Sequence, residues 1–361
     1  MSGSQEKAEH FSDFDRNLLR ESVRALLLRF WPADTAVERS VDAPAIAAVW
    51  QEMAAQGLAS LGARAGDTGL RELALVFEEL GRASCPAPML GAMAANLALA
   101  DDRTNVVRSF MEDLHQGKAA VALALGAFDG DRAAGRIEAR GDGLNGKISF
   151  VEGAQSATHV LVFTEAPAGA AIVVAGAPGL QVQETPGLAI PAFSELTFKN
   201  TPATLVELSS DALADIAVMA RIACLARALG AAQRAFDLAV EHAKVRKQFG
   251  QFVGQFQAVQ HKLANSLIAL DGARLTLEAA AEARDNGGAD WRIFAAATLA
   301  FAGPALREVS IQTHRALGAI GYAEEHEAPR HFRRVHTDVA RFGGVPHARA
   351  ALADYLLGPQ Q

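Results

Sequence analysis

Aromatic residues and cysteines are scarce in this sequence of 361 residues. Phe, Trp and Tyr make up 6% of it, and the two cysteines, Cys85 and Cys224, stand far apart in apolar surroundings. Such a spacing matches neither a disulfide framework nor a metal-ligand motif. We therefore expect both thiols to be buried as small apolar side chains and expect no metal site from them.

The chain also lacks a block of basic residues, a signal peptide and an uninterrupted apolar run. Its formal net charge is −7 with Lys and Arg dispersed, which argues against a nucleic-acid partner. Residues 1–19 are polar, unlike a secretory signal. The apolar run at 216–240 contains Arg221, Arg227 and Arg234, which predicts a buried helix rather than a membrane span. We expect a cytoplasmic protein with no membrane partner.

Alanine and other apolar residues are abundant instead. Half of the residues are hydrophobic, and alanine-rich apolar sequence favours closely packed helices. Apolar residues spaced three or four apart predict that residues 1–116 form an N-terminal helical domain. The helices expected there cover residues 18–30, 45–58, 69–83 and 91–98.

The pattern changes to short strand-like runs across residues 117–209. Gly, Asp, Asn and Pro separate these runs, with no helical segment between them, which predicts an antiparallel β-barrel or sandwich. The DGLNG sequence at 142–146 predicts a hairpin turn. The expected strands are 120–125, 136–140, 147–153, 159–165, 170–176, 180–185, 195–200 and 203–208.

Helical periodicity returns in residues 210–361. Long helices are expected at 211–244, 256–284 and 291–317, and a shorter one at 347–357, as in an antiparallel four-helix bundle. The fold class is therefore mainly α with a β insert. The length of the chain and the two changes of pattern predict three domains, 1–116, 117–209 and 210–361.

A motif interrupts the C-terminal helices at residues 245–264, VRKQFGQFVGQFQAVQHKLA. It resembles the Arg-x-x-Phe-Gly signature of the acyl-CoA dehydrogenase family. Three further segments resemble the family in the same order along the chain. They are GLRELALVFEELGRASCPAPML, DGLNGKISFVEGAQSATHVLVF and GAIGYAEEHEAPRHFRR. The resemblance covers nearly the whole sequence and implies the family's fold of a helical domain, a β domain and a helical bundle.

The resemblance implies flavin-dependent α,β-desaturation of an acyl-CoA thioester. A carboxylate takes the α-proton, and FAD accepts the β-hydride. In this family the arginine of the motif lies near the FAD of a neighbouring subunit. Arg246 is therefore expected to contact the pyrophosphate across a dimer interface, with Gln248 beside it. Phe249 is expected at the adenine end, and Gln257 is expected to assist from the next helix.

Other cofactor and substrate positions follow from the same resemblance. Arg315 matches a glutamine that contacts the cofactor, with Gln312 as the alternative if the chain contains an insertion. Phe150 stands where the family usually sets a Trp against the flavin, and Glu152 stands at a hydroxyl position. Arg221 matches an arginine of the long helix and is expected to be substrate-binding. The flavin loop is replaced by the shorter LGAFDGDRAAG at 125–135.

The family's catalytic glutamate is missing from both places where it is known to occur. The usual position holds Phe342 or Gly343, and the alternative position on the long helix holds Ala220. Asp338 lies near the lost position, but a carboxylate five residues upstream on a helix points elsewhere, and a surface or capping role is the simpler interpretation. No catalytic residue is therefore assigned.

Two charged groups outside these positions leave alternatives open. The EEHE sequence at 324–327 could suggest a metal site, but it lacks the Glu-x-x-His repeat of di-iron bundles, so a solvated turn is favoured. Arg330, Arg333 and Arg334 are either interface or phosphate contacts or a solvated helix face.

Three hypotheses for function remain open at this point. The first is an acyl-CoA dehydrogenase subunit that completes a partner's FAD site, resembling the base-lacking subunit of heterotetrameric, steroid-catabolism enzymes. The second is a self-sufficient FAD enzyme with an unusual base or reaction. The third is a flavin-free scaffold or acyl-CoA-binding protein. The expected partners are an acyl-CoA thioester and a related chain, in a homo- or hetero-oligomer that is a dimer or a dimer of dimers.

Overall fold

The computed structural model describes residues 12–63, 68–130, 135–141 and 143–358. Its N-terminal part is helical. Helix α1 begins after Ser12, whose hydroxyl accepts a hydrogen bond from the Asp15 backbone N–H at 3.2 Å while the Asp15 carboxylate accepts from Ser12 N–H at 3.0 Å, a reciprocal cap. The elements are α1 (Asp13–Phe30), α2 (Ala36–Arg39), α3 (Ala43–Ala55), η1 (Leu58–Ser60), α4 (Leu70–Arg82), α5 (Met89–Leu99) and α6 (Asn105–His115).

The middle part contains all eight predicted strands, arranged as two sheets. Their orders are β1-β4-β5-β8 and β2-β3-β7-β6, so the sheets form a sandwich and not a closed barrel. A short η2 (Gly126–Asp129) follows β1. The strands are β1 (Val121–Ala124), β2 (Gly135–Arg140), β3 (Gly143–Val151), β4 (His159–Glu165), β5 (Ala168–Val174), β6 (Leu180–Thr185), β7 (Phe193–Pro202) and β8 (Thr204–Glu207).

Two details of the sheets correct the sequence-based expectations. Strand β1 pairs with β4 in parallel, so the domain is not purely antiparallel. Arg140 pairs with Gly143, so the hairpin turn is tighter than the expected 142–146 and most of that segment is strand. Asp142 itself, like residues 131–134 of the expected flavin loop, lies outside the described residues. The turn was misplaced because the Asn145-Gly146 pair also has turn composition.

The first sheet is buried on both faces and joins the sandwich to the helices. Val160 and Val162 of β4 pack into the core between the two sheets, whereas Leu161 and Phe163 belong to the large core shared with the helices. Alternation of side chains along a strand produces this division. Strand β3, which carries Phe150 and is followed directly by Glu152, lies in the second sheet.

The C-terminal part consists of three long helices and two shorter ones. The apolar pattern gave no bounds for helix α10, because its sequence is rich in Arg and His and its apolar stripe is narrow. The elements are α7 (Ser210–Val245), β9 (Lys247–Gln248), β10 (Gln251–Phe252), η4 (Val253–Gln255), α8 (Gln257–Asp285), α9 (Trp291–Leu317), η5 (Gly318–Tyr322), α10 (Ala328–Ala340) and α11 (Gly344–Leu357).

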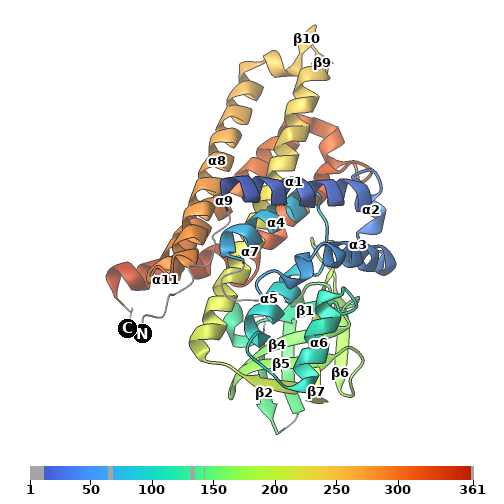
Figure 1. The fold of residues 1–361 in the computed structure, drawn as a ribbon. Coiled ribbons are helices and arrows are strands. Elements are labelled where there is room, and N and C mark those ends of the chain that lie inside the picture. The colour runs from blue at the N-terminus through green and yellow to red at the C-terminus, as the bar shows by residue number, and fades with distance from the viewer. Residues whose placement is uncertain (1–11, 64–67, 131–134, 142, 359–361) are drawn as a thin grey trace.

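Helix α7 runs the length of the molecule, from the sheets at one end to the β9–β10 hairpin at the other (Figure 1). Its middle is buried, and Cys224 is 2% exposed there while Cys85 is fully buried. Burial raises the pKa of the Cys85 thiol to about 12 and that of Cys224 to about 11, so the expectation of two buried thiols is confirmed. Among the helices described, none is long and apolar enough to cross a membrane.

Glycines allow α4 and α7 to approach each other closely. A Cβ atom on Gly81 would lie 1.8 Å from the Arg227 carbonyl oxygen, and one on Gly230 would lie 1.8 Å from the Glu78 carbonyl oxygen. Both distances are far below van der Waals contact, so only glycine fits at this crossing. The close approach fixes the part of α7 that carries the buried arginines described below.

Candidate functional site

At the positions where we expected the family's base to be missing, the structure shows closely packed backbone. Gly343 has φ +79°, a conformation that favours glycine. A Cβ atom there would lie 2.7 Å from the Cβ of His347 and 2.9 Å from the Gly130 carbonyl oxygen. Phe342 is 5% exposed with φ +54°, and Ala220 is fully buried in α7. None of these positions can present a proton acceptor.

Arg221 lies beside this backbone and ties three elements together. Its Nε donates to the Phe342 carbonyl at 2.8 Å, and its Nη2 donates to the Phe128 carbonyl in η2 at 2.9 Å. These bonds join α7 to η2 and to the segment before α11. Burial, and secondarily the positive charge of Arg221, lowers the pKa of the neighbouring His347 to about 4. The guanidinium of Arg221 thus binds backbone carbonyls within the chain. Its expected contact with substrate stays a prediction.

A cluster of five charged side chains lies where α7 and α10 meet the end of β3; four of them are buried, and the fifth, Glu152, has a side chain that is 12% exposed. The guanidinium of Arg227 binds both oxygens of Asp338, at 2.8 and 2.7 Å. Its Nη2 also donates to Glu152 Oε2 at 2.7 Å. Arg334 Nη1 donates to Glu152 Oε1 at 2.7 Å, and Arg341 donates to Glu152 Oε2. We call these five residues the Glu152 cluster.

The charges of the Glu152 cluster stabilise one another. Burial by itself would raise the pKa of Glu152, but the charges of Arg227, Arg341 and Arg334 hold that pKa well below its ordinary value. Burial would likewise lower the pKa of Arg227, yet Asp338 and Glu152 hold it well above its ordinary value. Glu152 and Arg227 are therefore both held in their charged forms. Three cations against two carboxylates leave the cluster with one excess positive charge.

The cluster corrects two of the sequence-based interpretations. Asp338 is 3% exposed and paired with Arg227, so it is neither a surface residue nor a cap. Arg330 and Arg334 are each 6% exposed, so a solvated helix face is wrong for both; Arg333 lies nearer the surface and pairs with Glu324 at 2.6 Å. The arginines within the apolar run of α7 are visible in the sequence, but the binding of Arg227 and Arg341 to Glu152 was not predicted from it.

The expected cofactor-binding residues of the motif lie at the far end of the molecule from the cluster. The β9–β10 hairpin is the tip in Figure 1, and Arg246, Gln248 and Phe249 are exposed on it. Phe249 is 93% exposed with φ +53° and meets only the edge of the Phe256 ring, at 6.2 Å. An exposed aromatic ring held in an uncommon backbone conformation is typical of a recognition surface.

The other residues expected at the cofactor lie in three different elements. Gln257 begins α8 beside the hairpin, and Arg315 lies near the end of α9; both are exposed. Gln312 is half-buried and contacts Glu308. Phe150 belongs to β3, with φ +64° and 44% of its surface exposed. The structure of the single chain thus brings Phe150 near the Glu152 cluster and leaves the motif residues far from both.

The acidic segment at 324–327 makes ion pairs. Glu324 pairs with Arg333, and Glu327 binds Arg234 through both oxygens. No group of His, Cys, Asp and Glu suited to a metal ion occurs in the part of the chain that the structure describes.

A helical domain, a β-sandwich and a helical bundle whose hairpin carries Arg-x-x-Phe-Gly define the architecture of flavin-dependent acyl-thioester dehydrogenases. The model of the acyl-CoA dehydrogenase C-terminal domain matches residues 214–344. The sequence is 30% identical over 333 residues to acyl-CoA dehydrogenase IpdE2 of Mycobacterium tuberculosis, covering 89% of this chain and 91% of that protein. The chain belongs to the acyl-CoA dehydrogenase family, whose enzymes are oxidoreductases that act on a CH–CH bond with FAD.

Solved structures show the same fold. A variant of the Tcur3481-Tcur3483 steroid ACAD superimposes with a TM-score of 0.83 at 26% identity, covering 95% of this chain and 98% of that one. The ChsE4-ChsE5 complex from Mycobacterium tuberculosis gives a TM-score of 0.83 at 21% identity, covering 98% and 99%.

The residues of this chain do not fit a flavin ring between β3 and the helices. An aromatic ring needs about 3.5 Å of clearance to the atoms on each face. Glu152, directly after β3, instead touches Arg227 of α7 and Arg334 of α10, each at 2.7 Å. Inserting a ring there would break buried ion pairs and leave charges uncompensated, which is strongly unfavourable.

Proposed function

We propose that this chain is the subunit of an acyl-CoA dehydrogenase that completes the FAD site of a related partner chain and performs no chemistry in its own cleft. The observation that carries the proposal is the Glu152 cluster, which occupies the space between β3 and helices α7 and α10 with five paired charges, four of them buried. The left-handed, closely packed glycine backbone at Gly343 supports the same conclusion.

The reaction in which the chain takes part is α,β-desaturation of an acyl-CoA thioester. The bound FAD supplies hydride acceptance at the β-carbon, and a carboxylate of the partner takes the α-proton, because this chain offers none at Ala220, Phe342 or Gly343. Arg246 would neutralise phosphate charge, a charge-assisted contact worth about 1.5–3 kcal/mol. Gln248 and Gln257 would add hydrogen bonds, Phe249 would cover the adenine end and Arg315 would supply a second cation.

The partner we propose is a related dehydrogenase chain that retains the base. One solved structure with this fold is a complex of ChsE4 with ChsE5, and another is a steroid ACAD with the paired name Tcur3481-Tcur3483. These names support a hetero-oligomer and an acyl-CoA substrate with a bulky ring system. The exposed hairpin and its distance from the chain's own β3 are what a contact in trans requires.

Purification with and without a partner tests the proposal. Expressed alone, the chain should be colourless; co-expressed with the partner, it should form a yellow, active complex with fewer flavins than chains. Flavin absorbance per chain provides the measurement. A chain that is yellow and active alone would instead establish a self-sufficient FAD enzyme, and one that never raises a partner's flavin content would establish a flavin-free scaffold.

An Arg246→Ala variant of the complex tests the contact in trans. Loss of a charge-assisted phosphate contact should weaken FAD retention by about tenfold or more, measured by flavin release during dialysis. The matched control is Arg140→Ala, which removes an exposed arginine of β2 that pairs with Glu138 and should leave retention unchanged. Equal retention in the Arg246→Ala and Arg140→Ala complexes would rule out the proposed contact.

A further inference from the structure

The first turn of α10 carries a buried arginine for which the described residues provide no hydrogen-bond acceptor. Arg330 is 6% exposed, and none of its three guanidinium nitrogens makes a hydrogen bond. Burial lowers the pKa of Arg330, which shows that the site disfavours the unaccompanied cation. Buried charges in proteins are normally paired, so this group calls for an anion.

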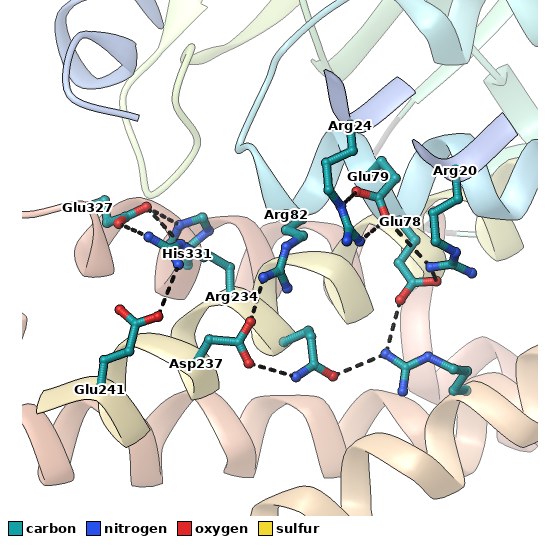
Figure 2. Close-up of polar contacts among 12 residues, drawn as sticks. Arg20, Arg24, Glu78, Glu79, Arg82, Arg234, Asp237, Glu241, Glu327 and His331 are labelled. Carbon is teal, nitrogen blue, oxygen red and sulfur yellow. Dashed lines mark hydrogen bonds and ion pairs between the residues drawn. The ribbon is translucent and has the colours of Figure 1, made fainter. Parts of the chain in front are cut away.

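The neighbouring carboxylate is already engaged by other residues. Glu327 Oε2 lies 4.0 Å from Arg330 Nη2. Figure 2 shows Glu327 bound instead to Arg234, at 2.6 and 3.2 Å, and in contact with His331 Nε2 at 3.3 Å. Burial would raise the pKa of Glu327, but hydrogen bonds from His331 and Arg234 lower it to about 2. Glu327 therefore balances Arg234 and does not neutralise Arg330.

Arg330 lines a cavity of about 10 Å³ at the junction of the helices and the β-sandwich. That volume has room for about one small particle, so a monatomic anion fits it more readily than a phosphate group. Its walls come from the end of α2, the segment after α4, the β6–β7 connection and α10, and they include no acidic residue. The polar side chains of the wall are Ser40, Ser84, Arg330, Arg333, Arg334 and Thr337.

The other polar groups of the wall have partners, but they add to the positive potential. Arg334 binds Glu152 and the Ile190 carbonyl, and Arg333 pairs with Glu324. The hydroxyl of Ser84 contacts His331 Nδ1 at 3.0 Å. Three guanidinium groups thus surround a space that can hold one small particle, and one of them lacks an acceptor. That combination favours an anion over a neutral water molecule.

We propose that this cavity is a binding site for a single halide ion, chloride under physiological conditions, with Arg330 as its principal ligand. The ion neutralises Arg330 and connects the end of α2, the segment after α4 and the β6–β7 connection to α10. The site lies apart from the FAD contacts of the hairpin, so its function is to stabilise the junction of the domains.

Thermal unfolding in matched salts tests the site. The purified full-length chain is compared in sodium chloride, sodium bromide and sodium gluconate at equal ionic strength, because gluconate is too large for the cavity. A halide concentration ten times the dissociation constant of the site should raise Tm by about 2 °C relative to gluconate. Arg330→Met should abolish this difference. Arg136→Met, which removes an exposed arginine of β2, should retain it.

Anomalous diffraction from crystals soaked in bromide provides a test that does not depend on a variant. A bromide peak between Arg330 and Arg334 is the expected result. The proposal is overturned by a water molecule there with no anomalous signal, by equal Tm in halide and gluconate, or by a halide effect that survives Arg330→Met.

Discussion

Gly343 shows how backbone conformation limits the side chain that one position can carry. It is one of the two positions, with Phe342, at which we propose that the base is missing, and it has a left-handed backbone that lies against Gly130 and His347. Placing a glutamate there would require both an unfavourable φ and displacement of neighbouring atoms. On this proposal, the loss of the base involves the backbone and not the side chain alone.

Gly343→Glu should destabilise the chain rather than restore a catalytic site. The substitution places a side chain at φ +79°, which costs about 1–3 kcal/mol before any clash is counted. Urea unfolding measures the loss. The control is Gly187→Glu, where a Cβ atom meets nothing within 4 Å. An unchanged midpoint for Gly343→Glu, or desaturase activity of that variant alone, would refute this account.

The Glu152 cluster makes a second prediction at the scale of a residue. Asp338→Ala removes the carboxylate that binds Arg227 through two hydrogen bonds, and it leaves a buried cation short of negative charge. Breaking a buried pair from one side costs about 3–5 kcal/mol. The free energy of unfolding should fall by that amount, whereas Asp354→Ala, at an exposed position of α11, should change it little.

At the scale of elements, the crossing of α4 and α7 positions the cluster. Gly81 and Gly230 bring the two backbones so close that a methyl group on either would overlap a carbonyl of the other helix. Figure 2 shows how charged side chains continue this contact, with Arg82 bound to Asp237, and Arg20 and Arg24 of α1 bound to Glu78 and Glu79 of α4. Glu78 and Glu79 are buried, so these ion pairs supply the compensating charge that the two carboxylates need at the helix crossing.

Gly230→Ala should be destabilising although alanine is the better helix former. The new methyl group would meet the Glu78 carbonyl oxygen at 1.8 Å, and such overpacking costs about 1–3 kcal/mol. In the control, Gly272→Ala in α8, the methyl group meets the tip of the half-exposed Phe301 ring at 3.1 Å. That ring can move, so helix propensity should make the control neutral or slightly stabilising. Chemical denaturation of both variants distinguishes the two effects.

At the scale of the whole molecule, buried histidines make stability depend on pH. Burial lowers the pKa of His331 and of His347 to about 4, whereas both rings titrate near 6.5 in the unfolded chain. Between these values the unfolded state binds more protons than the folded state. The free energy of unfolding should therefore fall as pH decreases from about 6.5 to about 4.

Urea titrations at pH 7.5 and pH 5 measure this loss. His347→Gln removes one of the two groups and should reduce the difference between the two pH values, although absolute stability can change as well. Equal pH dependence in the variant and the unaltered chain would show that His347 titrates normally when folded.

Local patterns in the sequence were sufficient for most of the elements. The periodicity of apolar residues identified α7, α8 and α9 and every strand from β1 to β8, because the faces of a helix or strand repeat over a few residues. The bounds of helix α10 were not predicted, because its buried face is made of Arg, His and Asp side chains as well as Val335 and Val339. The parallel pairing of β1 with β4 was not predicted, because strand order depends on distant contacts.

The sequence by itself determined the family and the order of the helical and β parts. Only the tertiary structure decided which charged groups meet. Arg227 binds the carboxylates of Glu152, 75 residues before it, and of Asp338, 111 residues after it. It also decided that Arg330 is buried with no hydrogen-bond acceptor among the described residues, and that the Arg-x-x-Phe-Gly residues lie on an exposed hairpin far from β3 (Figure 1). The reason is physical: periodicity reports a residue's own element, whereas partners of buried charges are set by how distant elements pack.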